Sequence, residues 1–294
     1  MSSFISYLIS GISLGSVYAI IALGYTMVYG IAKMLNFAHG DVIMVGSYVV
    51  YVAVSGMGLN PILAILLSII ICTLMGVVIE GVAYRPLRNA ASPLAVLITA
   101  IGVSYLLQNL ATYITGGLAR PYPEISFLKK SFAVGSLNIK IITLLTPVLT
   151  ILLVISLVIF IKHTKTGMAM RAVSKDFDTA RLMGIKVNSV ITVTFIIGSF
   201  LAGVGSILYF TNYGQVSPTI GAMPGLKAFV AAVFGGIGSI PGAFLGGLLL
   251  GIIEAMAQAY ISTNLANSIV FAVLIVVLLV KPAGLLGKSV TEKV

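Results

Sequence analysis

The chain begins with MSSFISYLISGISLGSVYAIIALGYTMVYGIA (residues 1–32), a stretch that contains no charged side chain. A helix needs about 20 predominantly apolar residues to cross the hydrocarbon core of a bilayer. The stretch therefore predicts a membrane-spanning helix at roughly residues 4–30. Long uncharged runs recur further along the sequence, so the same argument applies to most of the chain.

The composition supports this fold class. Of the 294 residues, 59% are hydrophobic and 8% are charged, whereas soluble globular domains carry about 25% charged residues. A soluble core of this length cannot hide so much apolar surface, but lipid can solvate it. We therefore expect an all-α integral membrane protein. Its transmembrane helices should form one polytopic bundle and a single domain over residues 1–294.

Breaks in the uncharged runs divide the chain into further spans. Gly, Asn and Pro at positions 56–61 end one run, because these residues favour turns. The segment 226–240 is apolar but short for a crossing, which indicates a broken or re-entrant helix. The other spans are expected near residues 36–54, 61–84, 93–116, 141–161, 190–210, 243–260 and 269–280, for a total of eight or nine.

Most of the 31 glycines fall inside these expected spans. Small residues four positions apart let helices in lipid approach closely. Gly11 with Gly15, and Gly247 with Gly251, have this spacing and favour tight helix packing. Glycines that line a substrate path or act as hinges are the alternative.

Basic residues predict the orientation. The net charge is +10, and the basic residues sit in gaps between apolar runs, so a nucleic-acid partner is not expected. With Lys33, Arg85, Arg88, the segment 162–186 and the C-terminal tail on one side, that side carries 12 Lys and Arg. The other side carries five, namely Arg120, Lys129, Lys130, Lys140 and Lys227. The richer side is expected to be cytoplasmic. With nine crossings, the N-terminus is then outside.

Asn36, His39 and Asp41 form the first candidate site, at the start of the second expected span. Ionisable side chains at membrane depth are costly and often functional. In a structural interpretation, they bond to one another or to free N–H groups at the helix start. In a functional interpretation, they belong to the translocation path or its gate. Their types and spacing do not predict a metal site.

Glu254 is the second candidate. It is the one charged residue in positions 228–280, with no basic residue within 26 positions. An isolated carboxylate near mid-span is costly to insert into lipid. We expect it to be protonated, bonded to a neighbouring helix, or exposed to a water-filled cavity. Each of these arrangements is compatible with a structural role for Glu254 and with a role in the translocation path.

The loop 162–189 is the third candidate, because it is polar, long and compatible with a helix. Ser174 or Asp176 suits a helix start and Gly184 a helix end. The residues that share one face at helical spacing are Phe177, Ala180, Arg181 and Gly184. The charged residues expected at its rim are Arg171, Asp176, Asp178 and Arg181. The plain interpretation is a basic cytoplasmic loop, and the alternative is a docking element for a soluble partner.

Sequence motifs of several enzyme classes are missing. There is no GxxxxGK[ST] loop for phosphate, no GxSxG and no HExxH. The single cysteine, Cys72, cannot form an internal disulfide. We therefore do not expect an enzyme, nor an ATP site of the phosphate-loop type in this chain.

Three segments carry a recognisable pattern, namely GYTMVYGIAKMLNFAHGDVIMVGSYV (24–49), TGMAMRAVSKDFDTARLMGI (166–185) and KAFVAAVFGGIGSIPGAFLGGLLLGIIE (227–254). They resemble the LivH-type permease subunits of bacterial branched-chain amino acid ABC importers. The spacing between them also fits, so the resemblance covers nearly the whole chain.

The resemblance implies an assembly in the bacterial inner membrane. Its other members would be a homologous LivM-type permease subunit, two cytoplasmic ATPases that bind ATP and Mg, and an extracytoplasmic amino-acid-binding protein. It also implies that the loop 162–189 holds the helix that couples the permease to the ATPase. The positions that match the family pattern there are Gly167, Arg171, Ala172, Asp176, Ala180, Gly184 and Ile185.

Leu, Ile and Val are the substrates that the resemblance favours. Related permeases for urea, short-chain amides or sugars remain alternatives. A different class, an ion-coupled secondary transporter or channel, is also compatible with an isolated Glu254 and a broken helix at 226–240.

Overall fold

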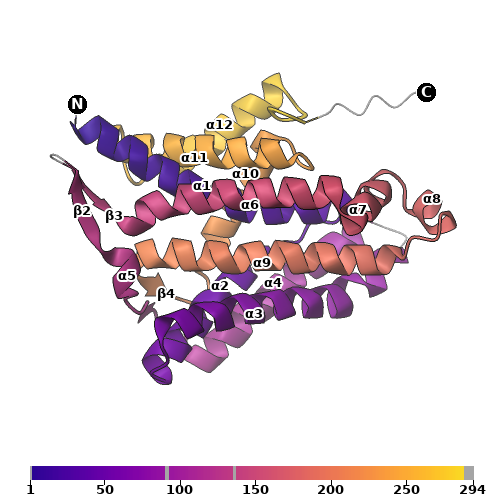
Figure 1. Ribbon diagram of the computed structural model, residues 1–294, viewed down its shortest axis with the longest axis horizontal. Helices are drawn as coiled ribbons and strands as arrows, with labels where there is room; N and C mark the ends of the chain where they lie inside the picture. The colour runs from indigo at the N-terminus through magenta and orange to yellow at the C-terminus, as the bar shows by residue number, and fades with distance from the viewer. Residues whose placement is uncertain (1, 90–92, 135–136, 288–294) are drawn as a thin grey trace.

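The computed structural model describes residues 2–89, 93–134 and 137–287. Long helices run side by side along one axis and make up most of the molecule (Figure 1). Six described helices are long and apolar enough to cross a bilayer. They are α1 (Ser2–Ala32), α3 (Pro61–Ile79), α4 (Pro93–Thr115), α6 (Ile141–His163), α9 (Val187–Tyr213) and α11 (Ile240–Tyr260). The chain is therefore a polytopic helical membrane protein.

Three further apolar helices are shorter. They are α2 (His39–Tyr51), which continues as the π-helix η1 (Val52–Gly56), α10 (Ala222–Gly235) and α12 (Ala266–Val280). A helix of 14 residues such as α10 is about 21 Å long, less than the roughly 30 Å hydrocarbon core. The expected eight or nine full spans are thus not confirmed. The segment 226–240, expected to be a broken or re-entrant helix, is instead covered by α10, which is short but continuous to Gly235, and by the turn before α11.

Short elements close the two ends of the bundle. At one end, β2 (Ser131–Val134) pairs with β3 (Leu137–Lys140) near the start of α1 (Figure 1). At the same end, β1 (Arg120–Pro121) pairs with β4 (Gln215–Val216), and both pairs are antiparallel. The helix α5 (Ser126–Lys129) lies between these strands in sequence. At the opposite end lie α7 (Lys165–Lys175) and α8 (Phe177–Leu182) (Figure 1). These strands are the departure from the all-α expectation.

Individual residues set several helix boundaries. Asn60 Oδ1 accepts the N–H of Ile62 at 2.9 Å, and Pro61 takes the first position of α3, where its missing N–H is not needed. Ser239 Oγ accepts the N–H of Gly242 at 3.2 Å at the start of α11. Gly214, with φ of 69°, ends α9 in the left-handed conformation that glycine tolerates.

Helix α1 lies at the centre of the bundle and packs closely against α11. Gly15 lies against the backbone of Gly247 and Leu248, and a Cβ added to Gly251 would overlap Gly15. The predicted small-residue spacing is therefore confirmed as a packing contact between these two helices. No side chain separates the two backbones at this point.

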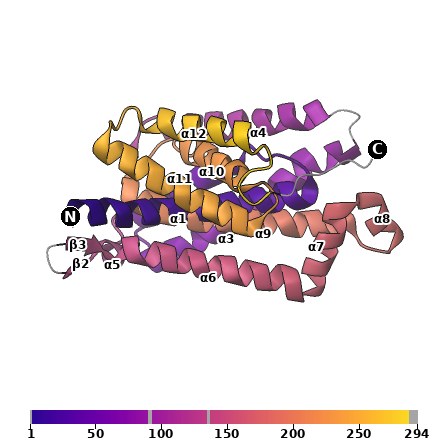
Figure 2. The ribbon, with the colours of Figure 1, turned by 90° about the horizontal axis from the view of Figure 1, so that it is seen from above.

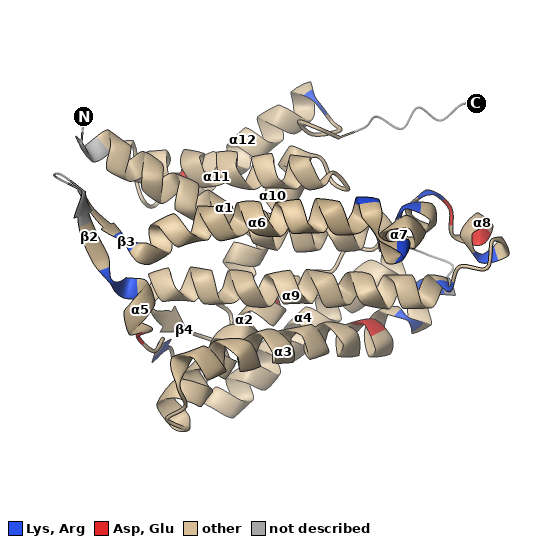
Figure 3. Cartoon of the chain, viewed as in Figure 1, with Lys and Arg blue, Asp and Glu red and all other residues tan. Residues whose placement is uncertain are grey.

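The outer faces of α3, α4 and α6 are apolar. Leu74, Ile98 and Val148 are 58%, 68% and 63% exposed, as expected for side chains that contact lipid. Figure 2 shows α4 and α12 along one edge of the bundle and α6 along the opposite edge. Most Lys and Arg lie at the two ends, and few charged residues lie between them (Figure 3). The tail after Lys281 is expected on the cytoplasmic side, and its last residues, 288–294, lie outside the described residues.

Candidate functional site

Glu254 on α11 is buried and bonded through both carboxylate oxygens. Lys227 Nζ on α10 donates to Oε1 at 2.6 Å, and the Tyr18 hydroxyl on α1 donates to Oε2 at 3.0 Å. Gln258 Nε2 also donates to Oε1, at 3.1 Å. Of the arrangements expected for this carboxylate, the structure has the bonded one, with partners on two neighbouring helices.

Lys227 corrects the predicted charge distribution. The sequence argument places it in an extracytoplasmic loop, but it lies inside α10 and is 6% exposed. An unpaired lysine is costly in lipid, and the nearby carboxylate of Glu254 offsets that cost. The pairing also removes the isolated carboxylate on which the secondary-transporter alternative depended.

Asn36, His39 and Asp41 are all buried, at 2%, 1% and 1% exposure, and each faces a different neighbour. Asn36 Oδ1 accepts from the Tyr84 hydroxyl at 3.2 Å. The His39 ring packs edge-on against Tyr25 of α1, with ring centroids 4.6 Å apart. Helix α2 begins without a side-chain cap, so these residues do not bond to its free N–H groups, but Asp41 lies in its first turn, where a carboxylate is favoured as expected.

Asp41 is joined to α4 rather than to its sequence neighbours. Its Oδ1 accepts from Gln108 Nε2 at 2.9 Å, and Gln108 Nε2 is also 3.2 Å from Ser104 Oγ. Its Oδ2 is buried and has no hydrogen-bond partner among the described residues. Gln108 was not identified from the sequence, because a glutamine in an apolar helix gives no indication of a partner 67 positions away.

Asp41 lines a cavity of about 320 Å³ between α2, α4 and α10. Polar groups on its wall come from Ser104, Gln108 and the two tyrosines at 25 and 105. Its apolar wall is formed by Phe37, Ile101, Leu226 and Phe229. The starts of α2 and α10 meet beside it, where Gly40 lies directly against Gly221 and Gly225. The cavity combines an apolar wall with a single carboxylate.

The sequence predicts one short helix in the loop 162–189, from Ser174 or Asp176 to Gly184; the structure has two, and the second, α8, starts directly after Asp176 and ends before Gly184. Thr164 Oγ1 accepts the N–H of Gly167 at 2.9 Å at the start of α7. Asp176 Oδ1 accepts the N–H of Thr179 at the start of α8, and this hydrogen bond lowers the pKa of the Asp176 carboxyl. Gly184, with φ of 81°, follows α8, and the N–H of Ile185 reaches the Ala180 carbonyl at 3.0 Å.

The apolar residues on the surface of the loop 162–189 are not the predicted ones. Ala180 is 3% exposed because this chain covers it, and Phe177 and Ala172 are half-buried. The exposed apolar side chains at the tip are Leu182 and Met183, at 88% and 78%. The exposed charged side chains are Arg171, Asp176, Asp178 and Arg181. Asp178 and Arg181 form an ion pair at 3.2 Å.

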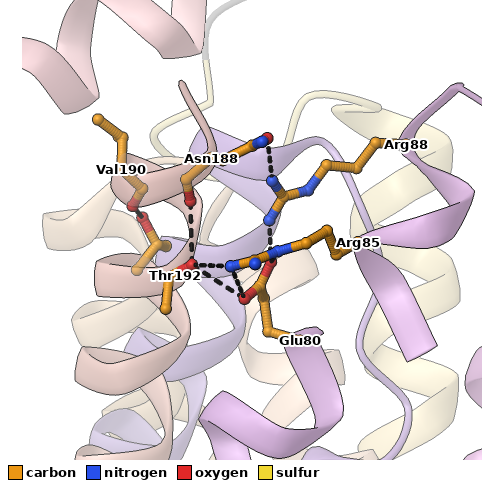
Figure 4. A network of polar contacts seen from close by, with 7 residues as sticks. Glu80, Arg85, Arg88, Asn188, Val190 and Thr192 are labelled. Carbon is orange, nitrogen blue, oxygen red and sulfur yellow. Dashed lines mark hydrogen bonds and ion pairs between the residues drawn. The ribbon is translucent and has the colours of Figure 1, made fainter. Parts of the chain in front are cut away.

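Glu80 joins the start of α9 to the end of α3 (Figure 4). Its carboxylate, in the π-helix η2 (Glu80–Tyr84), is fully buried and is paired with Arg85 and Arg88. Arg88 lies in the 3₁₀ helix η3 (Pro86–Asn89) and donates to Asn188 Oδ1. Thr192 Oγ1 donates to Glu80 Oε2 at 2.9 Å. Arg85 lies five positions from Glu80 in the sequence, whereas the contacts with α9 lie more than 100 positions away.

Comparisons with known proteins agree over nearly the full length. A family model described as the permease component of branched-chain amino acid transport systems matches residues 7–279. The chain is 44% identical to LivH, a high-affinity branched-chain amino acid transport system permease protein of Salmonella typhimurium, over 99% of this chain and 98% of that protein. It is 42% identical, with the same coverage, to BraD of Pseudomonas aeruginosa, which has the same description.

Among solved structures, PsaBC from Streptococcus pneumoniae in complex with Fab aligns over 96% of this chain and 91% of that chain. Its TM-score of 0.42 and identity of 17% are too low to support an argument. The family match and the two relatives suffice without it. The chain belongs to the family of permease components of branched-chain amino acid transport systems.

Proposed function

We propose that this protein is the membrane-spanning permease subunit of an ABC importer that moves Leu, Ile and Val across the bacterial inner membrane. The observation that carries this proposal is the similarity to LivH and BraD over nearly the full length of all three chains. The buried polar residues inside the bundle support it, since polar groups at membrane depth commonly line transport paths. Asn36, His39, Asp41 and Glu254 belong to this path or support its walls.

The energy for uptake enters through partner chains. Two cytoplasmic ATPases bind ATP and Mg, and one of them docks on α7 and α8 of this chain. Leu182 and Met183 support this assignment, because exposed apolar side chains within a charged rim suit a groove on a soluble protein. A LivM-type permease completes the membrane part, and an extracytoplasmic binding protein delivers the amino acid at the opposite end.

Co-purification and reconstitution test this proposal. The tagged chain, isolated from its native membrane, should bring along an ATPase, a second permease and a binding protein. In liposomes, the assembly should accumulate leucine only when ATP is supplied on the ATPase side, and ionophores should not abolish uptake. Uptake driven by an ion gradient without ATP would contradict the proposal. Preferred uptake of urea, acetamide or fructose over leucine would contradict the substrate alone.

A further inference from the structure

We infer that the cavity beside Asp41 binds the amino acid in transit, with the Asp41 carboxylate receiving its ammonium group. The inference rests on the proposed function, and it assigns that function a specific site and a specific contact. The contacts and burial around Asp41 carry it.

Charge is the first part of the argument. Asp41 is the one charged side chain among the residues that line the cavity. Gln108 donates to its Oδ1 and Ser104 also lies close to the carboxylate, whereas the buried Oδ2 has no hydrogen bond of normal geometry in the described part of the chain. A buried carboxylate oxygen without a partner is costly. The nearby buried lysine, Lys227, is already bonded to Glu254, so the free oxygen is available to a cationic ligand.

Shape and polarity select the kind of cation. A metal ion such as Ca²⁺ or Mg²⁺ requires several oxygen ligands, and no group of three acidic, His or Cys side chains exists among the described residues. The cavity instead has an apolar wall that includes Phe37 and Phe229, whose ring centroids are 5.8 Å apart. Its volume of about 320 Å³ falls in the range of small-molecule sites. These features fit an organic ammonium group with an aliphatic body.

The carboxylate of an amino acid also finds a suitable partner. Helix α10 begins at Ala222, which lines the same cavity, and no side chain caps this helix start. The N–H groups of Ala222 and Gly225 are bonded to Thr219 and Gly221 and Pro224 has none, but the positive end of the helix dipole still favours an anion there. The two charges of the zwitterion and its aliphatic side chain would thus meet three different parts of the wall.

Photo-leucine, a leucine analogue with a diazirine, tests the site directly. The permease–ATPase complex is placed in nanodiscs without the binding protein, so that the selectivity of that protein does not contribute. After illumination, mass spectrometry should find label on peptides of α2, α4 or α10 that line the cavity. Excess leucine should suppress this label, whereas 4-methylpentanoate, which lacks the ammonium group, should not.

Two variants and one control make the test specific. Asp41→Asn keeps the shape of the residue but removes its charge, and should reduce the label roughly tenfold. Leu226→Trp fills the cavity but keeps the charge of Asp41, and it should also reduce the label. Glu124→Gln, which removes an exposed carboxylate outside the cavity, should leave it unchanged. ATPase activity shows that each variant complex is intact.

Several results would overturn the inference. One is that photo-leucine labels no peptide that lines the cavity. Another is that Asp41→Asn leaves the label unchanged in an intact complex. Retention of phosphatidylethanolamine by the wild type and not by Asp41→Asn, without photo-leucine label, would assign the site to lipid. If the wild-type complex imports leucine in these cases, only this inference fails. If it does not import leucine at all, the proposed function fails as well.

Discussion

At the scale of single residues, the pair formed by Lys227 and Glu254 links α10 to α11, and Tyr18 adds α1 to the same contact. Removing one member of a buried pair leaves an uncompensated charge and costs about 3–5 kcal/mol. Replacing both members by apolar residues of similar size often costs little. The pair therefore predicts a strong non-additivity between the two positions.

Lys227→Met and Glu254→Leu should each lower the thermal stability of the detergent-solubilised protein by several degrees. The double variant should be more stable than either single variant, because no unpaired charge remains. Glu254→Gln should be less stable than the wild type, since the amide keeps the hydrogen bond from Tyr18 but no longer neutralises Lys227. Fluorescence-detected size-exclusion after heating measures all four variants. Effects that simply add would show that the two charges are not coupled.

At the scale of elements, the contact between α1 and α11 depends on glycine. A methyl group on Gly251 would overlap the backbone of Gly15, so the two helices would have to move apart. Overpacking of this kind costs about 1–3 kcal/mol. In α4, by contrast, a Cβ on Gly102 would meet no atom within 4 Å.

Gly251→Ala should lower the yield of folded protein and its melting temperature, whereas Gly102→Ala should leave both unchanged or slightly raised. The second change adds the same methyl group to another spanning helix, and alanine favours a helix over glycine by roughly 1 kcal/mol. Equal effects of the two substitutions would show that close packing of α1 on α11 does not limit stability.

Helix α8 is the element for which contact with a partner can be tested. Met183→Asp should release the ATPase while the permease still inserts, because the side chain is 78% exposed and its loss disturbs no internal contact. Ala180 is a poorer position for this test, because its side chain is 3% exposed and a larger one would disturb contacts within this chain. Met57→Asp, at an equally apolar position that is 66% exposed near the opposite end, is the control. Retention of the ATPase by Met183→Asp would remove this contact from the interface.

The elements that the sequence predicts well are those set by local rules. Span positions follow from run lengths, and the ends of α8 follow from Asp176 and Gly184, each of which acts within a few residues of itself. Lys227 and Gln108 could not be placed in this way. Their partners lie 27 and 67 positions away, on helices whose neighbours no local pattern specifies. The sequence therefore places Lys227 in a loop, whereas in the structure the carboxylate of Glu254 offsets the cost of burying its charge.

At the scale of the whole molecule, the two ends carry different structures. The β2–β3 hairpin and α5 lie at one end, and α7 and α8 lie at the other (Figure 1). With Lys227 inside the bundle, the poorer end keeps Arg120, Lys129, Lys130 and Lys140. The larger basic content of the α7–α8 end predicts that this end is cytoplasmic.

Cysteine labelling in intact cells tests the orientation. In a Cys72→Ala background, Glu124→Cys should react with a membrane-impermeant maleimide, because it lies at the end predicted to be outside. Asp178→Cys should react only after the membrane is permeabilised. Both native side chains are well exposed, at 76% and 87%, so a difference reports the side of the membrane. The opposite pattern would invert the topology and the proposed ATPase surface.

The burial of Glu80 has a consequence for cells under osmotic stress. When external osmolarity rises, bacteria raise the salt concentration of their cytoplasm, which screens exposed charges. The exposed Asp178–Arg181 pair weakens under these conditions. The fully buried carboxylate of Glu80 is shielded from that ionic atmosphere and keeps its bond to Thr192 on α9. The contact between Glu80 and the start of α9, at the end of the loop 162–189, should therefore persist in concentrated cytoplasm, while the Asp178–Arg181 ion pair on that loop weakens.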